Sequence, residues 1–327
     1  MNTIKLGTRG SKLALWQAEY IKETLERGGL SVEIVIINTK GDQILDRSLS
    51  KIGSKGIFTE ELEEQLRSGS IDIAQHSAKD LQSELSNDLE LIAFTEREKV
   101  NDVLVSFDKS LSLESGKPFV VGTSSTRRVA MLKHYYPHIQ TVDMRGNLQT
   151  RMGKLESGVC DALILAYAGV HRMGYEEHIA EVISTDKFTP AVGQGSVALE
   201  CAVSLNPEKK ARIRELCNHA ETEQQLLAER AFLRRLQGGC SIPVFGLAQA
   251  PRSVGRPAPD GGAFKSDFSF PPSGVRGLCG GLISLDGSEI LKETITGNNP
   301  VEMGNQLAEK ILSLGGDRIL KEIRANL

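Results

Sequence analysis

The sequence lacks the features that identify metal centres, disulfide scaffolds and membrane proteins. Its five cysteines are an odd number without a Cys-x-x-Cys pair, which argues against a disulfide framework and a structural zinc site. The six histidines form no His-Glu-x-x-His motif, so we expect no metal site. No hydrophobic run approaches the length of a membrane span, and the first twenty residues contain no apolar signal segment. We therefore expect a cytoplasmic protein that does not enter a membrane.

The chain has no excess of positive charge, although arginine is prominent in its motifs. The formal net charge is −3. Proteins that bind nucleic acids usually carry a basic face and a basic overall charge, so we expect no nucleic-acid partner. There is also no Walker A loop and no Gly-x-Ser-x-Gly elbow. A loose dinucleotide fingerprint begins at Gly193, but Pro190 interrupts the strand that should precede it, and we do not expect a nucleotide site there.

Strand-like and helix-like patterns alternate through the first two thirds of the chain. Residues 4–7 read as a strand, followed by a helix and by a strand at 32–37, which together make a βαβ unit. The apolar stripe of that helix is Leu13, Trp16, Tyr20 and Leu25. From about residue 220 the pattern changes to a helix at 221–236, a strand ending near 249, a hairpin at 285–287 and two terminal helices. This order predicts two or three domains, of α/β class with a separate α+β domain at the end.

Four segments place arginine near the turn from an expected strand into an expected helix. Such turns expose backbone N–H groups and the positive end of the helix dipole, and guanidinium groups there add bidentate partners for carboxylate or phosphate. In open α/β sheets this carboxyl edge is also where ligands bind. The segments are TRGS at 8–11, GTSSTRR at 122–128, RGNLQTR at 145–151 and GVHR at 169–172. We therefore expect a binding site for a small polyanion.

Two further motifs admit both a catalytic and a structural interpretation. His76-Ser-Ala-Lys79-Asp80 follows an expected buried strand, yet an adjacent Lys–Asp pair is usually an ordinary surface pair. Cys240 follows a Gly-Gly helix stop, which favours an exposed and reactive thiol, although most free cysteines are buried packing residues. The other four cysteines lie in helical or strand patterns, and we expect them to pack in the interior.

Two segments have the composition of loops. Residues 46–56 are polar, basic and glycine-containing, which suits either a lid over a site or a plain solvated loop. Residues 250–277 hold five of the eleven prolines without any period, which indicates an insertion or a linker.

Taken together, the motifs resemble those of the porphobilinogen deaminase family, whose members are also called hydroxymethylbilane synthases. The resemblance covers residues 3–247 and resumes at about 278. It rests on RGSKLALWQA, TKGD, GSKGIFTEELE, DIAQHSAKD, GTSSTRR, MRGNLQTR, LILAYAGVHRMG, PAVGQG and LQGGCSIPVFG. It implies an α/β protein of three domains, the first two like the lobes of type II periplasmic binding proteins with a cleft between them, and the third a smaller α+β domain.

The resemblance also implies domain boundaries and a reaction. Domain 1 is expected at 1–96 plus 197–215, domain 2 at 97–196, and domain 3 at 216–327 with the cofactor cysteine and the 250–277 insertion. The expected enzyme is a monomeric transferase of haem biosynthesis. It condenses four porphobilinogen molecules stepwise, with release of ammonia, into the linear tetrapyrrole hydroxymethylbilane. Growth starts on a covalently bound dipyrromethane cofactor, and hydrolysis releases the product.

Matched position by position, the family's motifs imply a role for each of several residues. Asp80 corresponds to the catalytic aspartate, and Cys240 to the cysteine that holds the cofactor as a thioether. The cofactor-binding positions are Lys79, Ser125, Arg127 and Arg128. The substrate-binding positions are Arg9, Ser11, Gln17, Lys55, Thr123, Arg145, Asn147, Arg151, Arg172 and Gln194.

The implied chemistry accounts for the arginines, because each pyrrole of porphobilinogen carries an acetate and a propionate. A growing chain of rings is therefore a ladder of carboxylates, which arginine can orient as well as neutralise. A solute-binding module could share two lobes and an arginine-lined cleft, but it needs neither a reactive cysteine nor a third domain. The sequence therefore favours the enzyme over a binding module.

Overall fold

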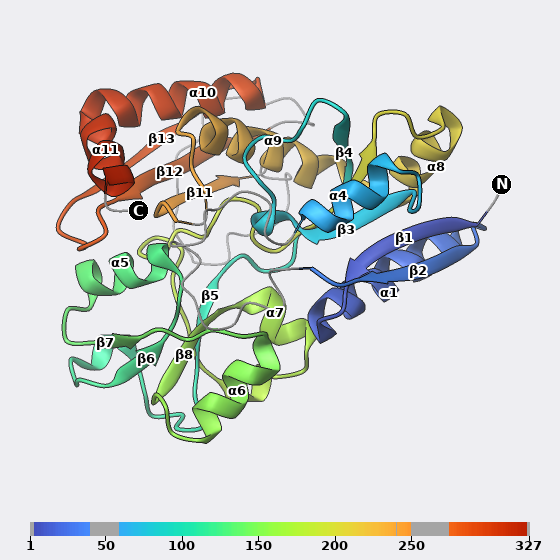
Figure 1. The fold of residues 1–327 in the computed structure, drawn as a ribbon. Helices are drawn as coiled ribbons and strands as arrows, with labels where there is room; N and C mark the ends of the chain where they lie inside the picture. Colours follow the sequence, from blue (N-terminus) through green and yellow to red (C-terminus); the bar gives the residue numbers. More distant parts are fainter. Residues whose placement is uncertain (1–2, 40–58, 240, 250–274, 326–327) are drawn as a thin grey trace, which may run out of the picture.

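The computed structural model describes residues 3–39, 59–239, 241–249 and 275–325, and within these residues the strands form three sheets (Figure 1). Two sheets have five strands each and the third has three. The expectation of an α/β protein with a smaller third domain is confirmed. None of the helices in the described ranges is long and apolar enough to cross a membrane.

The first lobe is built on a sheet whose strands run in the order β2-β1-β3-β10-β4. The strands β1, β2 and β3 are parallel, and β10 is antiparallel to both of its neighbours. The hydrophobic core of this lobe includes Ile4, Leu6 and Ile73 from the sheet and Ile21 from helix α1. The strands are β1 Ile4–Arg9, β2 Val32–Ile37, β3 Ile73–Ser77, β4 Leu89–Phe94 and β10 Val197–Ala202, and the helices are α1 Lys12–Arg27, α4 Glu60–Arg67 and α8 Pro207–Cys217.

The second lobe repeats this arrangement with strands in the order β7-β6-β8-β5-β9. Its antiparallel strand, β5, occupies the fourth position, as β10 does in the first lobe. The strands are β5 Asp102–Val105, β6 Val120–Gly122, β7 Gln140–Val142, β8 Ala162–Ala166 and β9 Ile179–Val182, and the helices are α5 Thr126–Tyr135, α6 Leu148–Glu156 and α7 Tyr167–Arg172. Each lobe is therefore an open α/β sheet with one strand reversed.

Two crossovers join the lobes. The chain passes from β4 to β5 through residues 95–101, and it returns from β9 to β10 through residues 183–196. Both crossovers lead into the reversed strand of the lobe that they enter. Helix α1 of the first lobe contacts helix α7 of the second, and the beginning of α1 lies next to α7 in Figure 1.

The third domain packs two helices that run in the same direction against a three-stranded antiparallel sheet. Helices α9 and α10 make close contact, and Gly304 permits it, because a Cβ at this position would lie 2.3 Å from the carbonyl oxygen of Ala228. Phe232 of α9 and Leu307 of α10 fill the core between the helices and the sheet. The elements are α9 Ala220–Arg235, β11 Val244–Gln249, β12 Gly277–Ile283, β13 Ile290–Ile295, α10 Pro300–Ile311 and α11 Asp317–Ala325.

The buried face of helix α1 differs from the predicted one. Its buried residues are Ala14, Gln17, Ala18, Ile21 and Leu25, whereas Trp16 is 38% exposed. The prediction of a core stripe through Trp16 was therefore wrong. Apolar character alone favours an aromatic side chain in the core, but the buried face of α1 is made by other residues. The indole instead lies against Arg172 at the end of α7.

The hairpin predicted at 285–287 is confirmed, since β12 and β13 pair in antiparallel register on either side of it. The long helix predicted at 221–236 is confirmed as α9. The segment 46–56, for which a lid was one interpretation, lies outside the described residues, as do Lys55, Cys240 and most of the 250–277 segment.

Candidate functional site

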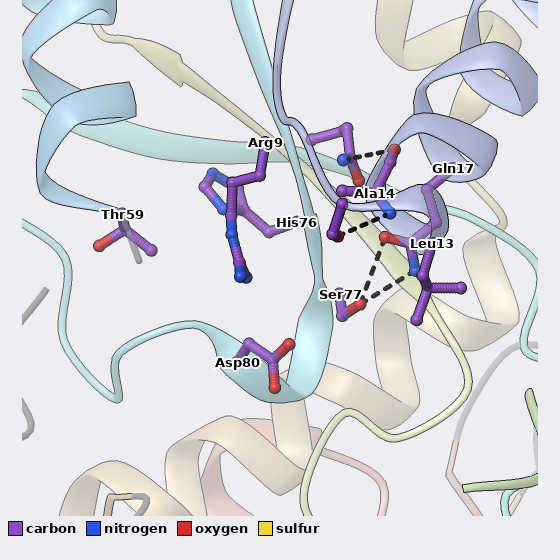
Figure 2. Close-up of a pocket in the computed structure, with 10 residues that line it drawn as sticks. Arg9, Leu13, Ala14, Gln17, Thr59, His76, Ser77 and Asp80 are labelled. Atoms are coloured by element: carbon purple, nitrogen blue, oxygen red, sulfur yellow. Dashed lines mark hydrogen bonds between the residues drawn. The ribbon is translucent and has the colours of Figure 1, made fainter. Parts of the chain in front are cut away.

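A pocket in the first lobe opens where β1 and β3 end (Figure 2). Its empty volume is about 440 Å³. Arg9 is the last residue of β1, and Asp80 ends the short 3₁₀ turn Ala78–Asp80 that follows β3. The side chains of Arg9 and Asp80 point toward one another in Figure 2. The lining residues are Arg9, Ser11, Leu13, Ala14, Gln17, Thr59, Gln75, His76, Ser77 and Asp80.

The two members of the Lys79–Asp80 pair differ in environment. Asp80 is exposed, whereas Lys79 is half-buried and its ammonium donates to Oε1 of Gln194 at 3.4 Å. Burial, followed by the charge of Arg128, lowers the pKa of Lys79 to about 8. A carboxylate open to the pocket and a lysine held at the lobe junction are unlike an isolated surface pair.

The second lobe contributes arginines held by one buried carboxylate. Asp102, the first residue of β5, is fully buried and accepts from Nη2 of Arg127 at 2.7 Å and from Nη2 of Arg128 at 2.7 Å. Burial by itself would raise the pKa of Asp102, but the two guanidinium groups outweigh it and hold that pKa well below its usual range. Arg127 also donates to the carbonyl of Thr189 at 2.9 Å, and Arg128 to the carbonyl of Ile164 at 3.0 Å.

A surplus of positive charge lies next to Asp80. Burial, followed by the charge of Arg128, lowers the pKa of Arg151 to about 10, with Arg145 acting in the same direction and Asp80 opposing it. The charge of Arg128 also lowers the pKa of Lys79. Because these cations come from both lobes and repel one another, a polyanion bound among them would be strongly stabilised.

Three predicted site residues begin helices. The side chains of Ser11, Ser125 and Asn147 are the N-caps of α1, α5 and α6, where they accept from the backbone N–H three residues further on. Thr123 is buried, and its hydroxyl accepts from the backbone N–H of Ser125 at 3.3 Å. These residues therefore shape the turns that present the neighbouring arginines.

The two predicted glutamines are buried and connect separate parts of the chain. Gln17 donates to the hydroxyl of Ser77 at 2.9 Å. Gln194 donates to the carbonyl of Val100 at 2.7 Å and to Asp102 at 3.0 Å, which joins the two crossovers. Its contact with Lys79 extends this link to the first lobe.

Arg172 lies apart from the strand edge, at the last position of α7. Its Nη2 donates to the carbonyl of Gly195 at 2.8 Å, and its guanidinium carbon lies 5.5 Å from the centre of the Trp16 ring. Burial lowers the pKa of Arg172. This arginine therefore sits between the lobes instead of at the end of β8.

Four cysteines fall within the described residues. Cys160, Cys201 and Cys217 are buried in hydrophobic clusters, as predicted, and burial raises the pKa of each thiol, to about 12 for Cys201 and Cys217. Cys279 is half-buried in β12. No group of three His, Cys, Asp or Glu side chains in the described ranges is arranged to hold a metal.

The sequence interpretation missed buried residues that support the site, among them Asp102 and Glu200. Asp102 was overlooked because a single acid at the start of an apolar strand has no motif. His76 was noted only as part of a motif, but its Nε2 lies 3.0 Å from Oε2 of Glu200, and both side chains are buried. Glu200 is 124 residues away, in the antiparallel strand β10, so no local pattern could pair the two.

Sequence comparisons identify the relatives of this chain. Residues 4–209 match the family model described as "Porphobilinogen deaminase, dipyromethane cofactor binding domain", and residues 223–253 match "Porphobilinogen deaminase, C-terminal domain". The chain is 52% identical to a porphobilinogen deaminase of Cytophaga hutchinsonii over 99% of this chain and 98% of that protein. It is 47% identical to one of Desulfosudis oleivorans, with 98% of each covered.

Two solved structures match about two thirds of this chain at low sequence identity. The methionine-binding protein MetQ is 15% identical with a TM-score of 0.41, covering 66% of this chain and 89% of that chain. A substrate-binding domain of a putative amino acid transporter from Streptococcus pneumoniae is 15% identical with a TM-score of 0.40, covering 65% and 91%. Each similarity leaves about a third of this chain unmatched.

Proposed function

The chain belongs to the porphobilinogen deaminase family, and we propose that it condenses four porphobilinogen molecules stepwise into hydroxymethylbilane, releasing ammonia at each addition. The members of this family are transferases. The model that matches residues 4–209 describes the domain that binds the dipyrromethane cofactor. The match along nearly the whole chain to relatives named porphobilinogen deaminase carries this proposal. Porphobilinogen is then the substrate, and the enzyme acts in the biosynthesis of haem and other tetrapyrroles.

The cationic residues beside Asp80 fit the cofactor of the family. Dipyrromethane carries an acetate and a propionate on each of two rings, hence four carboxylates. Arg128 acts electrostatically on Lys79, Arg127 and Arg151. Burial, followed by this positive charge, lowers the pKa values of Lys79 and Arg151, and a bound anion would relieve the repulsion. We assign cofactor binding to Lys79, Ser125, Arg127 and Arg128. When bound, the cofactor supplies the free pyrrole position at which chain growth begins.

Substrate and growing chain are assigned to the surrounding polar residues. Carboxylates bind guanidinium in a bidentate manner, and each such charge-assisted bond contributes about 1.5–3 kcal/mol. That energy is enough to hold successive rings in register. The residues assigned to this role are Arg9, Ser11, Gln17, Lys55, Thr123, Arg145, Asn147, Arg151, Arg172 and Gln194.

Asp80 is the proposed catalytic residue. Loss of ammonia from the aminomethyl group, and the carbon–carbon bond formation that follows, each place positive charge on a pyrrole nitrogen. A carboxylate near that nitrogen stabilises the charge and can accept and return protons. At about 4 Å and an effective dielectric constant near 20, the attraction is about 4 kcal/mol, or roughly a thousandfold in rate. The opening of Asp80 to a pocket shared with Arg9 supports this role.

Cys240 is the proposed attachment point of the cofactor. Its structure lies outside the described residues, so the support comes from the other cysteines. A buried thiol with a raised pKa is a poor nucleophile, and Cys160, Cys201 and Cys217 are of that kind. A thioether keeps the cofactor on the protein when hydrolysis frees the product.

Three further assignments complete the proposal. We assign domain 1 to 1–96 plus 197–215, domain 2 to 97–196 and domain 3 to 216–327. The first two boundaries fall in or at the end of the crossovers, and the third falls in the last turn of α8. The enzyme acts as a monomer. We assign it to the cytoplasm.

The intact mass of the purified protein tests the proposal. We expect a mass above that of the bare chain by one dipyrromethane group, a positive colour reaction for pyrroles, and formation of hydroxymethylbilane from porphobilinogen. Cys240→Ala is expected to show the bare-chain mass and no turnover. A folded parent protein at bare-chain mass that forms no product after incubation with porphobilinogen would overturn the assignment.

A further inference from the structure

Trp16 and Arg172 come from different lobes and meet at the lobe junction. Trp16 lies on α1 and Arg172 ends α7, and the guanidinium carbon lies over the indole ring at 5.5 Å from its centre. This is within the range in which a cation is attracted to the face of an aromatic ring. On the same helix, the ring of Trp16 stacks on Tyr20, with centres 5.7 Å apart and an interplanar angle of 3°. The indole is therefore held as a flat support beneath the arginine.

The remaining surroundings of Arg172 fix its position without neutralising it. Its Nη2 donates to the carbonyl of Gly195 in the second crossover at 2.8 Å. Gly195 has φ of +102°, and a Cβ there would lie 2.6 Å from the carbonyl oxygen of Glu98, so only glycine presents its carbonyl in this way. Glu98 and Tyr20 act on Arg172 electrostatically, but among the described residues no carboxylate lies within 4 Å of its guanidinium.

A guanidinium has five N–H donors, and the hydrogen bond to Gly195 uses one of them. An aromatic ring over the face of a guanidinium leaves the donors on its edge available for a carboxylate. Trp16 is 38% exposed, so the ring contributes little to the core, which is filled instead by Ala18 and Ile21. Its exposure and its contact with Arg172 indicate a role at the junction rather than in folding.

We propose that Trp16 is a positioning residue that holds the Arg172 guanidinium between the lobes, with its edge presented to a carboxylate of the substrate or of the growing chain. This inference rests on the proposed substrate-binding role of Arg172. The contact spans both lobes, so separation of α1 from α7 would release Arg172 from the ring. Through Trp16, the affinity of Arg172 for a carboxylate therefore depends on how close the two lobes are.

The kinetic test compares Trp16→Leu with Trp16→Phe in the cofactor-loaded enzyme. Leucine removes the cation–π contact, and we expect KM for porphobilinogen to rise by about three- to tenfold with kcat changed less than about twofold, the range expected for such a contact. Phenylalanine keeps a ring face and is expected to give an intermediate KM. Phe107→Leu is the matched control, because Phe107 is an exposed aromatic residue of the second lobe that packs on His178, away from α1.

The optical test uses the fact that Trp16 is the only tryptophan of the chain. We expect Arg172→Met to change the emission of the resting enzyme, and porphobilinogen to change the emission of the parent but not of Arg172→Met. Parent-like KM in Trp16→Leu, or identical emission of the parent and Arg172→Met, would overturn the inference. If Arg172→Met itself kept the parent KM, the substrate-binding role of Arg172 would be wrong, whatever the emission spectra showed.

Discussion

Arg97 and Glu229 form a buried, two-pronged ion pair, with Nη1 to Oε1 at 2.6 Å and Nη2 to Oε2 at 3.0 Å. Glu229 is fully buried in α9 and also accepts from the backbone N–H of Gly193 at 2.8 Å and of Ala248 at 2.9 Å. Arg97 lies in the first crossover, Gly193 in the second, and Ala248 in β11. One carboxylate of the third domain therefore ties together both connections between the lobes.

Removing either partner of this pair is expected to destabilise the whole protein. Glu229→Gln leaves the charge of Arg97 buried and unpaired, and Arg97→Met leaves the charge of Glu229 buried and unpaired. The free energy of unfolding should therefore fall by about 3–5 kcal/mol in either variant. Unfolding in denaturant measures this free energy. The matched control is Arg235→Met, which breaks the exposed pair with Glu309 and should cost about 1 kcal/mol or less. Equal losses for the buried and exposed pairs would contradict this interpretation.

Arg127 is expected to be needed for folding as well as for cofactor binding. Arg127→Leu removes one of the two guanidinium groups that hold the buried Asp102, and it frees the carbonyl of Thr189. We expect a loss of about 3–5 kcal/mol in the free energy of unfolding, in the cofactor-free state. Measuring the variant in the Cys240→Ala background separates this effect from loss of the cofactor. Arg145→Leu, at a half-buried position, serves as the comparison and should lose much less stability. A parent-like stability of Arg127→Leu would show that Asp102 does not depend on it.

Lys79 should give the cofactor-free protein a distinctive pH dependence. Its pKa is about 8 in the folded protein, against 10.5 for an unperturbed lysine, so the unfolded chain binds more protons between these values. The contribution of this lysine to the free energy of unfolding must therefore increase as the pH rises from about 8 to 10.5. We expect the stability difference between Cys240→Ala and Cys240→Ala/Lys79→Met to grow in favour of Cys240→Ala across this window. A difference that stays constant would mean that Lys79 titrates as an ordinary surface lysine.

The charge of Asp80 is expected to matter more than its shape. Asp80→Asn keeps the side-chain size but cannot balance positive charge on a pyrrole nitrogen, so turnover should fall by about a thousandfold with little change in substrate affinity. Asp80→Glu retains the charge at a displaced position and should lose less. Single-turnover release of ammonia measures the step directly, with mass spectrometry to confirm that the cofactor is present. Parent-like ammonia release from Asp80→Asn would assign the catalytic role elsewhere.

Local sequence patterns predicted much of the fold but not the exchange of strands between lobes. The βαβ unit at the N-terminus, the helix at 221–236 and the hairpin at 285–287 follow from periodicity and turn residues acting over a few positions. The place of the reversed strand β10 does not, because β10 (Val197–Ala202) joins a sheet whose other strands lie between Ile4 and Phe94. The reversed strand β5 pairs with β8 and β9 and not with β6, which is nearer in sequence. Both placements are properties of the assembled sheets.

By itself, the sequence determined the family, the alternation of strands and helices, and the arginines and Asp80 near the turns that form the site. Short motifs carry these features because the chemistry of each residue type and the geometry of a strand–helix turn are local. Only the tertiary structure decided that Asp102 anchors Arg127 and Arg128, that Glu229 joins the crossovers, and that Trp16 faces Arg172 instead of the core. These pairs are separated by 25 to 156 residues. Their energies come from burial and electrostatic contact, which exist only after the lobes and the third domain have packed together.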